Sequence, residues 1–474
     1  MFAGRLRELA ALQRLLTTDE PALILVTGAR RIGKSRLVRE ACVHGNVINF
    51  RAGEETPRLS FQAFKRACLR HLPDADLDVF GDWQGLLGGL AAEAARSQKG
   101  LTLVIDNFSS LSDADAGLPL IIRNFWRSGA AEAGAMKLVL IGENIARMTE
   151  LTRGQPTSAE HALADCAPEL FDLMPLPLQD SAGFFPGYTH EARIAAYAIF
   201  GGVPGYLAAC DPQKPLAGNI LDLLLAPDSR LIDEPLAVLS HGLRDVKVYA
   251  SILRAIANGH RESGDIRSFV MGAATGMSIS SYLERLRALR LIDGERSLDA
   301  DPKSRYMRFA ICDPLTRFWN LFVQPNRGVI DEGGGRDLFE NTIKRQLADY
   351  MVSAFETICR DFVRSHGSRL FGVHPVAVGQ MWGPGYNIPV AGRQPGRGLL
   401  VGACAWQVQS VSEAGFAHLA QQARKSGQGP DSLTAPEPDY VLFSRSGFSA
   451  DLKSFADQSP HLRLLTPADI LDAA

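Results

Sequence analysis

Short apolar runs alternate with amphipathic segments over the first 150 residues of the chain. The runs at 22–28 (ALILVTG), 46–50 (NVINF), 101–106 (LTLVID) and 137–142 (KLVLIG) are short and rich in apolar residues, which is typical of buried strands. The segments at 34–41 and 84–97 have the apolar spacing of helices. Strands that alternate with helices indicate a parallel sheet that helices cover on both faces. The pattern therefore predicts an α/β domain over residues 1–180.

The pattern changes after about residue 180. Residues 190–330 are mostly amphipathic helix, with breaks at glycine and proline such as GGVPG at 201–205. The segment 326–336 (NRGVIDEGGGR) is rich in glycine and poor in apolar residues, which favours a linker. Beyond it, apolar runs at 398–406 and 439–444 indicate a return to mixed α and β structure. These changes predict boundaries near residues 180, 325 and 336.

Composition and charge exclude several classes of protein. The 474 residues are 46% hydrophobic and 22% charged, as in ordinary globular proteins, and the formal net charge of −2 excludes a histone-like protein that covers DNA by bulk charge. The longest apolar runs are too short to span a bilayer, and the first nine residues (MFAGRLREL) lack the apolar core of a secretory signal. Seven scattered cysteines without a CxxC pair are typical of reduced thiols. We therefore expect a cytoplasmic protein that does not associate with membranes.

A glycine-rich motif follows the first apolar run. The segment from Gly28 to Ser35 (GARRIGKS) fits the pattern GxxxxGK[ST] and lies between a predicted strand and a predicted helix. Glycines let main-chain N–H groups surround a phosphate, and the following helix N-terminus adds its positive dipole end. The alternative without a ligand is a glycine-rich turn with an exposed lysine. The residues predicted to bind the nucleotide here are Gly28, Ala29, Arg30, Arg31, Ile32, Gly33, Lys34, Ser35 and Arg36.

The third apolar run ends at a candidate metal-binding acid. Asp106 closes LTLVID, so we expect Ser35 and Asp106 to hold the Mg²⁺ of a bound ATP, although a strand-end aspartate can also be a simple cap. The next residue is Asn107, where many ATPases have the glutamate that activates water. Asparagine cannot accept a proton from water at neutral pH. We therefore predict slow or conditional ATP hydrolysis, in which Asn107 orients a water or Glu143, at the end of the fourth run, replaces the missing base.

Taken together, the motifs resemble those of the archaeal-type ATPases of the STAND/AAA+ group of P-loop NTPases. Besides the P-loop, the resemblance rests on the opening Phe2-Ala3-Gly4-Arg5, on Gly142-Glu143-Asn144, on GGVPGYL at 201–207, and on the stretches at 233–235 and 313–319. It implies that Gly4 and Arg5 lie against the nucleotide and that Pro204 lies near the base and ribose. The alternatives are a solvated Arg5, a simple turn at 201–205 and a strand cap at 143–144.

The resemblance also implies a winged helix after a helical lid. Helices at 249–257, 263–270 and 278–289 and short strands at 291–292 and 308–310 fit that order. Residues 244–308 contain 12 Lys or Arg and 8 Asp or Glu, a net charge of +4. Arg285, Arg287 and Arg290, on or just after the third helix, are the candidates for DNA phosphate contacts. Alternatively, the domain packs on its neighbours as a protein module and these arginines are solvated.

The last domain resembles a PD-(D/E)XK nuclease that has lost its acids. Glu356 and Cys359 match the helix of that fold, but Pro389, Ala403 and Ala405 stand where its Asp, Glu and Lys are expected. Residues 362–412 contain no Asp or Glu, and divalent cations need carboxylate oxygens. The resemblance therefore implies a retained α/β restriction-endonuclease-like fold without nuclease activity.

These observations favour an ATP-binding P-loop ATPase that acts as a nucleotide switch, with ATP and Mg²⁺ as ligands. The alternatives are a winged-helix DNA-binding regulator in which nucleotide is mainly structural, and a nuclease, which the missing carboxylates disfavour. A protein partner or self-association stays open. The predicted domains are a P-loop NTPase domain (1–180), a helical lid (181–240), a winged helix-turn-helix domain (241–325), a linker (326–336) and a nuclease-like domain (337–474).

Overall fold

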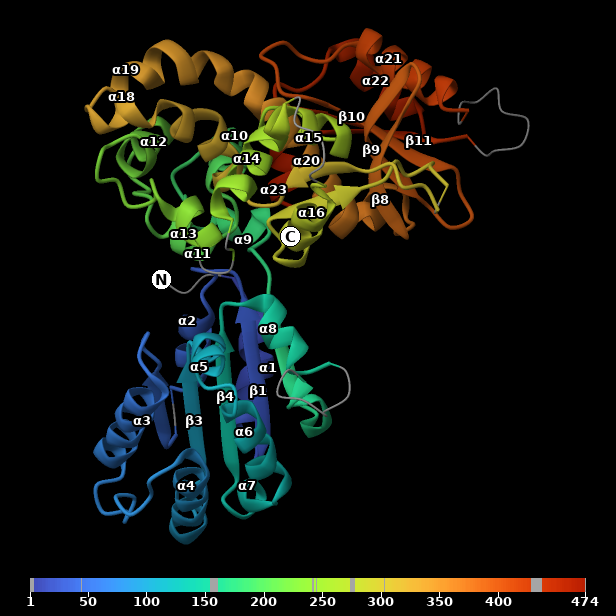
Figure 1. Ribbon diagram of the computed structural model, residues 1–474. Helices are drawn as coiled ribbons and strands as arrows, with labels where there is room; N and C mark the ends of the chain where they lie inside the picture. The colour runs from blue at the N-terminus through green and yellow to red at the C-terminus, as the bar shows by residue number, and fades with distance from the viewer. Residues whose placement is uncertain are drawn as a thin grey trace. The chain divides into compact units, whose positions relative to one another are not determined.

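The computed structural model describes residues 4–43, 45–153, 161–240, 243, 245–272, 278–301, 303–427 and 437–473 (Figure 1). Phe2 and Ala3 of the opening motif lie outside these ranges. The chain forms two compact units. The N-terminal unit consists of Phe2–Pro175 and Val203–Gly205, and the C-terminal unit consists of Leu176–Gly202 and Tyr206–Ala474.

The N-terminal unit is built on a parallel five-stranded sheet with the order β2-β3-β4-β1-β5. Its strands are β1 (Ala22–Gly28), β2 (Val47–Arg51), β3 (Leu101–Asp106), β4 (Met136–Gly142) and β5 (Glu169–Leu173). The sequence pattern predicts the first four within one residue. It does not predict β5, because this edge strand (ELFDL) is short, mostly exposed and interrupted by Asp172, and it is defined by its pairing with β1.

Alternate residues of the central strands pack on opposite faces of this sheet. Leu23 and Leu25 of β1 belong to a core that also includes side chains of the flanking helices, whereas Ile24 and Val26 are equally buried and point to the other face. A sheet that is buried on both faces needs apolar residues at every position, which explains the unbroken runs in the sequence. The helices of this unit are α1 (Leu6–Thr17), α2 (Lys34–Ala41), α3 (Pro57–His71), α4 (Trp83–Ser97), α5 (Phe108–Ala114), α6 (Leu118–Arg127), α7 (Ala130–Ala133), α8 (Ile145–Glu150) and the 3-10 helix η2 (Ala164–Cys166).

The C-terminal unit begins with helices and ends with a mixed sheet. Its helices before the sheet are α9 (Leu178–Ala182), α10 (His190–Phe200), α11 (Pro204–Leu207, which starts in the N-terminal unit), α12 (Leu216–Leu224), α13 (Glu234–Ser240), α14 (Val246–Ala257), α15 (Ser263–Met271), α16 (Ser280–Ala288), α17 (Pro314–Phe318), η3 (Trp319–Val323), η4 (Gln324–Asn326), α18 (Arg327–Asp331), α19 (Gly335–Leu338), η5 (Phe339–Ile343) and α20 (Lys344–Phe371).

The segment 326–336 differs from the predicted linker. It includes α18 and the start of α19, and a Cβ atom built on Gly335 would lie 1.8 Å from the carbonyl oxygen of Leu225. Glycine is therefore needed here for close packing of two backbones. The segment is thus helical and packed, because glycine enrichment marks close backbone approach as well as chain flexibility. A linker between domains at this place stays a prediction.

Helices α14, α15 and α16 precede an antiparallel hairpin of β6 (Ile292–Glu295) and β7 (Arg308–Ile311). These elements have a buried core of their own, which includes Ile252, Ile266 and Leu283. The order of elements agrees with the predicted helices and strands in this region. Its identity as a winged helix stays a prediction.

The C-terminal sheet has the order β12-β11-β10-β9-β8, with β10, β11 and β12 parallel and β8 and β9 antiparallel to their neighbours. Helix α20 contacts β8, β9 and β10, and α21 contacts β9 and β10. The remaining elements are β8 (Ala377–Gly383), β9 (Tyr386–Arg393), β10 (Leu399–Ala405), α21 (Glu413–Lys425), β11 (Asp439–Ser444), α22 (Ala450–Gln458), β12 (Leu462–Leu465) and α23 (Pro467–Leu471). This is a mixed α/β domain; its relation to nucleases stays a prediction.

The chain that follows β6 lies along the outer strand of this sheet. Leu298 N donates to Gln380 O of β8 (2.8 Å), and Gln380 N donates to the Glu295 carboxylate (3.0 Å). The Arg308 guanidinium lies 4.5 Å above the Trp382 ring. The hairpin region therefore covers the edge of β8, which would otherwise expose unpaired main-chain groups.

Among the described residues, no helix is long and apolar enough to cross a bilayer.

Candidate nucleotide-binding site

Three sequence motifs meet at one edge of the N-terminal sheet. Because its strands are parallel, the carboxyl ends of β1, β3 and β4 lie side by side, and β4 is between the other two. β1 leads into the loop before Lys34, β3 ends at Asp106, and Glu143 directly follows β4. This edge is where ligands bind in open α/β sheets.

The loop from Gly28 to Gly33 depends on glycine at both ends. Gly28 has φ 147°, and a Cβ atom there would lie 2.6 Å from the carbonyl oxygen of Leu173 in β5. Gly33 has φ 95° and directly precedes α2, whose N-terminus has no side-chain cap. An uncapped helix N-terminus presents main-chain N–H donors and the positive end of the helix dipole, which suits a phosphate.

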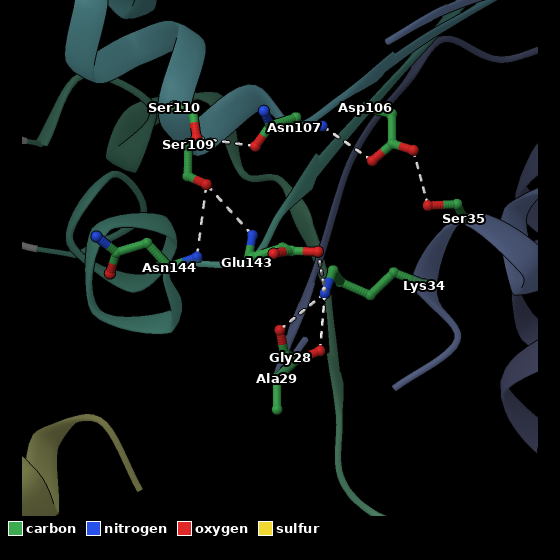
Figure 2. Close-up of polar contacts among 10 residues, drawn as sticks. All are labelled: Gly28, Ala29, Lys34, Ser35, Asp106, Asn107, Ser109, Ser110, Glu143 and Asn144. Atoms are coloured by element: carbon green, nitrogen blue, oxygen red, sulfur yellow. Dashed lines mark hydrogen bonds and ion pairs between the residues drawn. The ribbon is translucent and has the colours of Figure 1, made fainter. Parts of the chain in front are cut away.

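Lys34 is buried at the centre of the site, with 4% of its surface exposed. Its Nζ donates to Gly28 O (3.0 Å) and Ala29 O (2.9 Å) and lies 3.9 Å from Glu143 Oε1, as Figure 2 shows. Burial lowers the pKa of Lys34, whereas the carboxylates of Glu143 and Asp106 act in the opposite direction. A buried ammonium with only partial compensation from its neighbours is well suited to an anionic ligand.

Ser35 and Asp106 form the predicted metal pair. Ser35 Oγ donates to Asp106 Oδ2 at 2.7 Å, and Asp106 Oδ1 accepts from the Asn107 main-chain N–H at 2.9 Å (Figure 2). A hydroxyl and a carboxylate are oxygen donors of the kind that Mg²⁺ prefers when it also binds phosphates. Together with Lys34 and the α2 N-terminus, these residues fit a Mg²⁺–nucleotide.

Asn107 belongs to the turn between β3 and α5. Its backbone has φ 63°, a left-handed conformation that asparagine tolerates better than most residues. The side-chain amide donates to Ala52 O (3.2 Å) and accepts from Ser110 Oγ (2.8 Å). Figure 2 shows the amide turned toward Ser110. These contacts give Asn107 a structural role in the turn.

Glu143 and Asn144 have different surroundings. The main-chain nitrogens of both lie near Ser109 Oγ, at 3.2 and 3.4 Å. The Asn144 side chain accepts from Arg147 N and caps the helix α8. The Glu143 side chain points to Lys34 and is 40% exposed. The end of β4 therefore brings a carboxylate to the site.

Arg5 of the opening motif binds the loop between Gly28 and Gly33 through its side chain. Arg5 is 7% exposed, and its Nη2 donates to Ile32 O (3.1 Å) and Met174 O (2.7 Å). This excludes the alternative of a solvated arginine. Ile32 itself is fully buried, so its side chain belongs to the core, and Arg36 is exposed and pairs with Glu40.

The segment at 203–205 packs on the same loop. Gly205 N donates to Arg31 O at 3.1 Å, and a Cβ atom on Gly205 would lie 2.6 Å from the Arg31 Cβ. Pro204 Cγ is 3.9 Å from the position of a Cβ on Gly33. The segment is therefore more than a turn between helices, since it contacts the phosphate loop directly.

Two further sets of predicted residues lie in the C-terminal unit. Arg285 and Arg287 are on α16 and Arg290 follows it; Arg287 and Arg290 are exposed, whereas Arg285 is partly buried, with its charge near Tyr249. In the nuclease-like region, Glu356 lies on α20, and Arg360, which is 8% exposed, donates to the carbonyl of Pro389 at 2.8 Å.

This region does not fit a divalent metal. Burial raises the pKa of Glu356, with the nearby arginines 360, 261 and 317 opposing the shift. Within the described ranges, no group of three or more His, Cys, Asp or Glu side chains is arranged to hold a metal ion. The arginine side chains near Glu356 also disfavour the binding of a metal cation there by charge repulsion.

The N-terminal unit thus has the fold and the phosphate loop of a P-loop NTPase. In structure, the chain is similar to a Walker-type ATPase of Pyrococcus abyssi, with a TM-score of 0.50 and 16% identity over 68% of this chain and 96% of that one. It is also similar to the ORC2 protein of Aeropyrum pernix, with a TM-score of 0.44 and 14% identity over 70% of this chain and 95% of that one. At these identities the likeness concerns the fold alone.

Sequence comparisons extend to proteins without a known function. A family model described as archaeal and bacterial proteins of unknown function (DUF234) matches residues 319–415. An uncharacterized protein of Methanocaldococcus jannaschii is 24% identical over 364 residues, which is 77% of each chain. The match to the Methanocaldococcus protein spans most of the chain, and neither description gives an activity.

Arg5→Ala should loosen the phosphate loop. The substitution removes the guanidinium that binds the Ile32 and Met174 carbonyls, and loss of one partner of a buried hydrogen bond costs about 1–3 kcal/mol. We expect faster amide hydrogen exchange at residues 28–35 and weaker ATP binding. Arg7→Ala, an exposed arginine on α1, is the matched control. Unchanged exchange in the Arg5 variant would contradict this role.

Proposed function

We propose that the protein is an ATP-binding P-loop nucleotide switch with slow hydrolysis. The observation that supports this most is the convergence of the buried Lys34 with the Ser35–Asp106 pair at the N-terminus of α2. Lys34, the loop N–H groups and the helix dipole bind phosphate oxygens. Ser35 and Asp106 hold Mg²⁺, which neutralises phosphate charge when bound.

The site is poor in groups that activate water next to Asp106. Asn107 cannot accept a proton, and its amide is bonded to Ala52 and Ser110. General-base catalysis is typically worth about 10²–10⁴-fold in rate, so turnover is slow unless a residue other than Asn107 supplies the base. With slow hydrolysis, the ATP-bound form is long-lived and can differ in conformation from the ADP-bound form.

The nucleotide state reaches the rest of the chain through residues 203–205. This segment contacts Arg31 and Gly33 of the phosphate loop and is covalently continuous with α10 and α11. Leu176 N donates to Gly202 O at 2.7 Å, which joins the two places where the chain leaves the N-terminal unit. A shift of the loop on phosphate binding therefore moves both connections together.

ATP binding should require Lys34. A ligand that binds only the folded protein stabilises it by RT ln(1 + [L]/Kd), about 2.7 kcal/mol at a ligand concentration of 100 Kd. We expect ATP–Mg²⁺ to raise the melting temperature of the wild type and of Lys99→Ala, an exposed lysine, and to have no effect on Lys34→Ala. Equal shifts in all three proteins would refute the P-loop assignment.

Gly205→Ala should weaken the transmission from loop to helices. The added Cβ clashes with Arg31, whereas Gly187→Ala adds a Cβ with nothing within 4 Å. We expect ATP to change amide exchange in α10 in the wild type and in Gly187→Ala, and to change it less in Gly205→Ala. If the three proteins respond alike, the contact with Arg31 does not transmit the nucleotide state.

Nucleic-acid binding is a second candidate, supported by the exposed Arg287 and Arg290 at the end of α16. The hairpin region after β6 is already bound to β8, so α16 is the element that can offer phosphate contacts. We expect the double variant Arg287→Ala/Arg290→Ala to reduce the slope of the salt dependence of DNA binding by about 1 for each arginine that binds a phosphate. Arg336→Ala, an exposed arginine on α19, should not alter it. Absence of salt-dependent binding in the wild type would remove this candidate.

A further inference from the structure

The carboxylate of Glu143 lies in the site in which Asn107 offers no base. β4 separates β1 from β3, so its carboxyl end opens between the phosphate loop and Asp106. Glu143 Oε1 is 3.9 Å from Lys34 Nζ, the group that meets the terminal phosphates of a bound ATP. Glu143 therefore places a carboxylate within ion-pair distance of the ammonium that would bind the phosphates.

The backbone at Glu143 is fixed while its side chain stays accessible. Ser109 Oγ accepts from the main-chain nitrogens of Glu143 and Asn144, and Asn144 caps α8. The Glu143 side chain is 40% exposed, so water can reach its oxygens. A carboxylate on a fixed backbone with access to water has the two properties that a general base needs.

We propose that Glu143 is the general base of ATP hydrolysis in this protein; the proposal rests on the ATP binding proposed above. The water oxygen bonds to the γ-phosphorus, and the bond from that phosphorus to the bridging oxygen breaks, with its electron pair leaving on ADP. One proton of the water passes to the Glu143 carboxylate, which then releases it to solvent, and the other stays on the phosphate that forms. The products are ADP and inorganic phosphate.

The ion pair with Lys34 adds a second consequence. The Glu143 carboxylate and the ATP phosphates attract the same ammonium, so the pair must loosen when phosphates bind. Removal of the charge in Glu143→Gln therefore takes away a competitor of the phosphates. A base that also competes for Lys34 predicts opposite effects on turnover and on affinity, which a purely structural residue does not.

The experiment compares Glu143→Gln with the wild type in single-turnover hydrolysis and in calorimetric ATP–Mg²⁺ binding. We expect the hydrolysis rate to fall by about 10²–10⁴-fold, and the dissociation constant for ATP–Mg²⁺ to decrease. Glu143→Asp, which keeps the carboxylate on a shorter side chain, should recover part of the rate. Glu132→Gln, on α7 at the opposite end of β4, is the matched control and should leave both quantities unchanged.

The outcomes separate this inference from the proposed function. If the wild type does not bind ATP, the proposed function fails. If ATP binds and Glu143→Gln hydrolyses it at the wild-type rate, or if Glu143→Asp is no faster than Glu143→Gln, Glu143 is not the base. Weaker ATP binding by Glu143→Gln would overturn the competition for Lys34.

Discussion

A buried ammonium group must find compensation inside the protein, and in this chain Lys34 meets that requirement at the edge of a parallel sheet. Two loop carbonyls and the Glu143 carboxylate surround its Nζ. These polar partners compensate the ammonium charge only in part for the water that burial removes. The loop that positions this cation depends on the positive φ angles of Gly28 and Gly33. It is also held by the hydrogen bond from the Arg5 guanidinium to the Ile32 carbonyl.

The departure at Asn107 has a structural counterpart. Its left-handed backbone and its bonds to Ala52 and Ser110 suit asparagine and would strain a glutamate, which lacks the amide donor and disfavours φ 63°. Asn107 thus stabilises the turn after β3, but it cannot act as a base there. In the mechanism proposed above, Glu143 at the end of the neighbouring strand β4 takes the place of the missing base beside Asp106.

The C-terminal unit has specific packing contacts in the region where the resemblance to nucleases implies a catalytic site. Arg360 is bonded to the Pro389 carbonyl near Glu356, where the resemblance to nucleases would place metal-binding acids. The chain after β6 binds the edge of β8 through main-chain and side-chain hydrogen bonds.

The sequence by itself determined the strands β1 to β4, the helix α2 and the phosphate loop, because buried parallel strands require unbroken apolar runs and phosphate binding requires glycine at fixed spacing. It did not determine β5, whose short and mostly exposed segment forms a strand by pairing with β1, or the helical structure of 326–336, where Gly335 permits a close backbone contact. The approach of Glu143 to Lys34 and the support of the loop by Arg5 were also decided by the tertiary structure. Those contacts join residues more than 25 positions apart, and strand order, which local sequence patterns do not encode, brings them together.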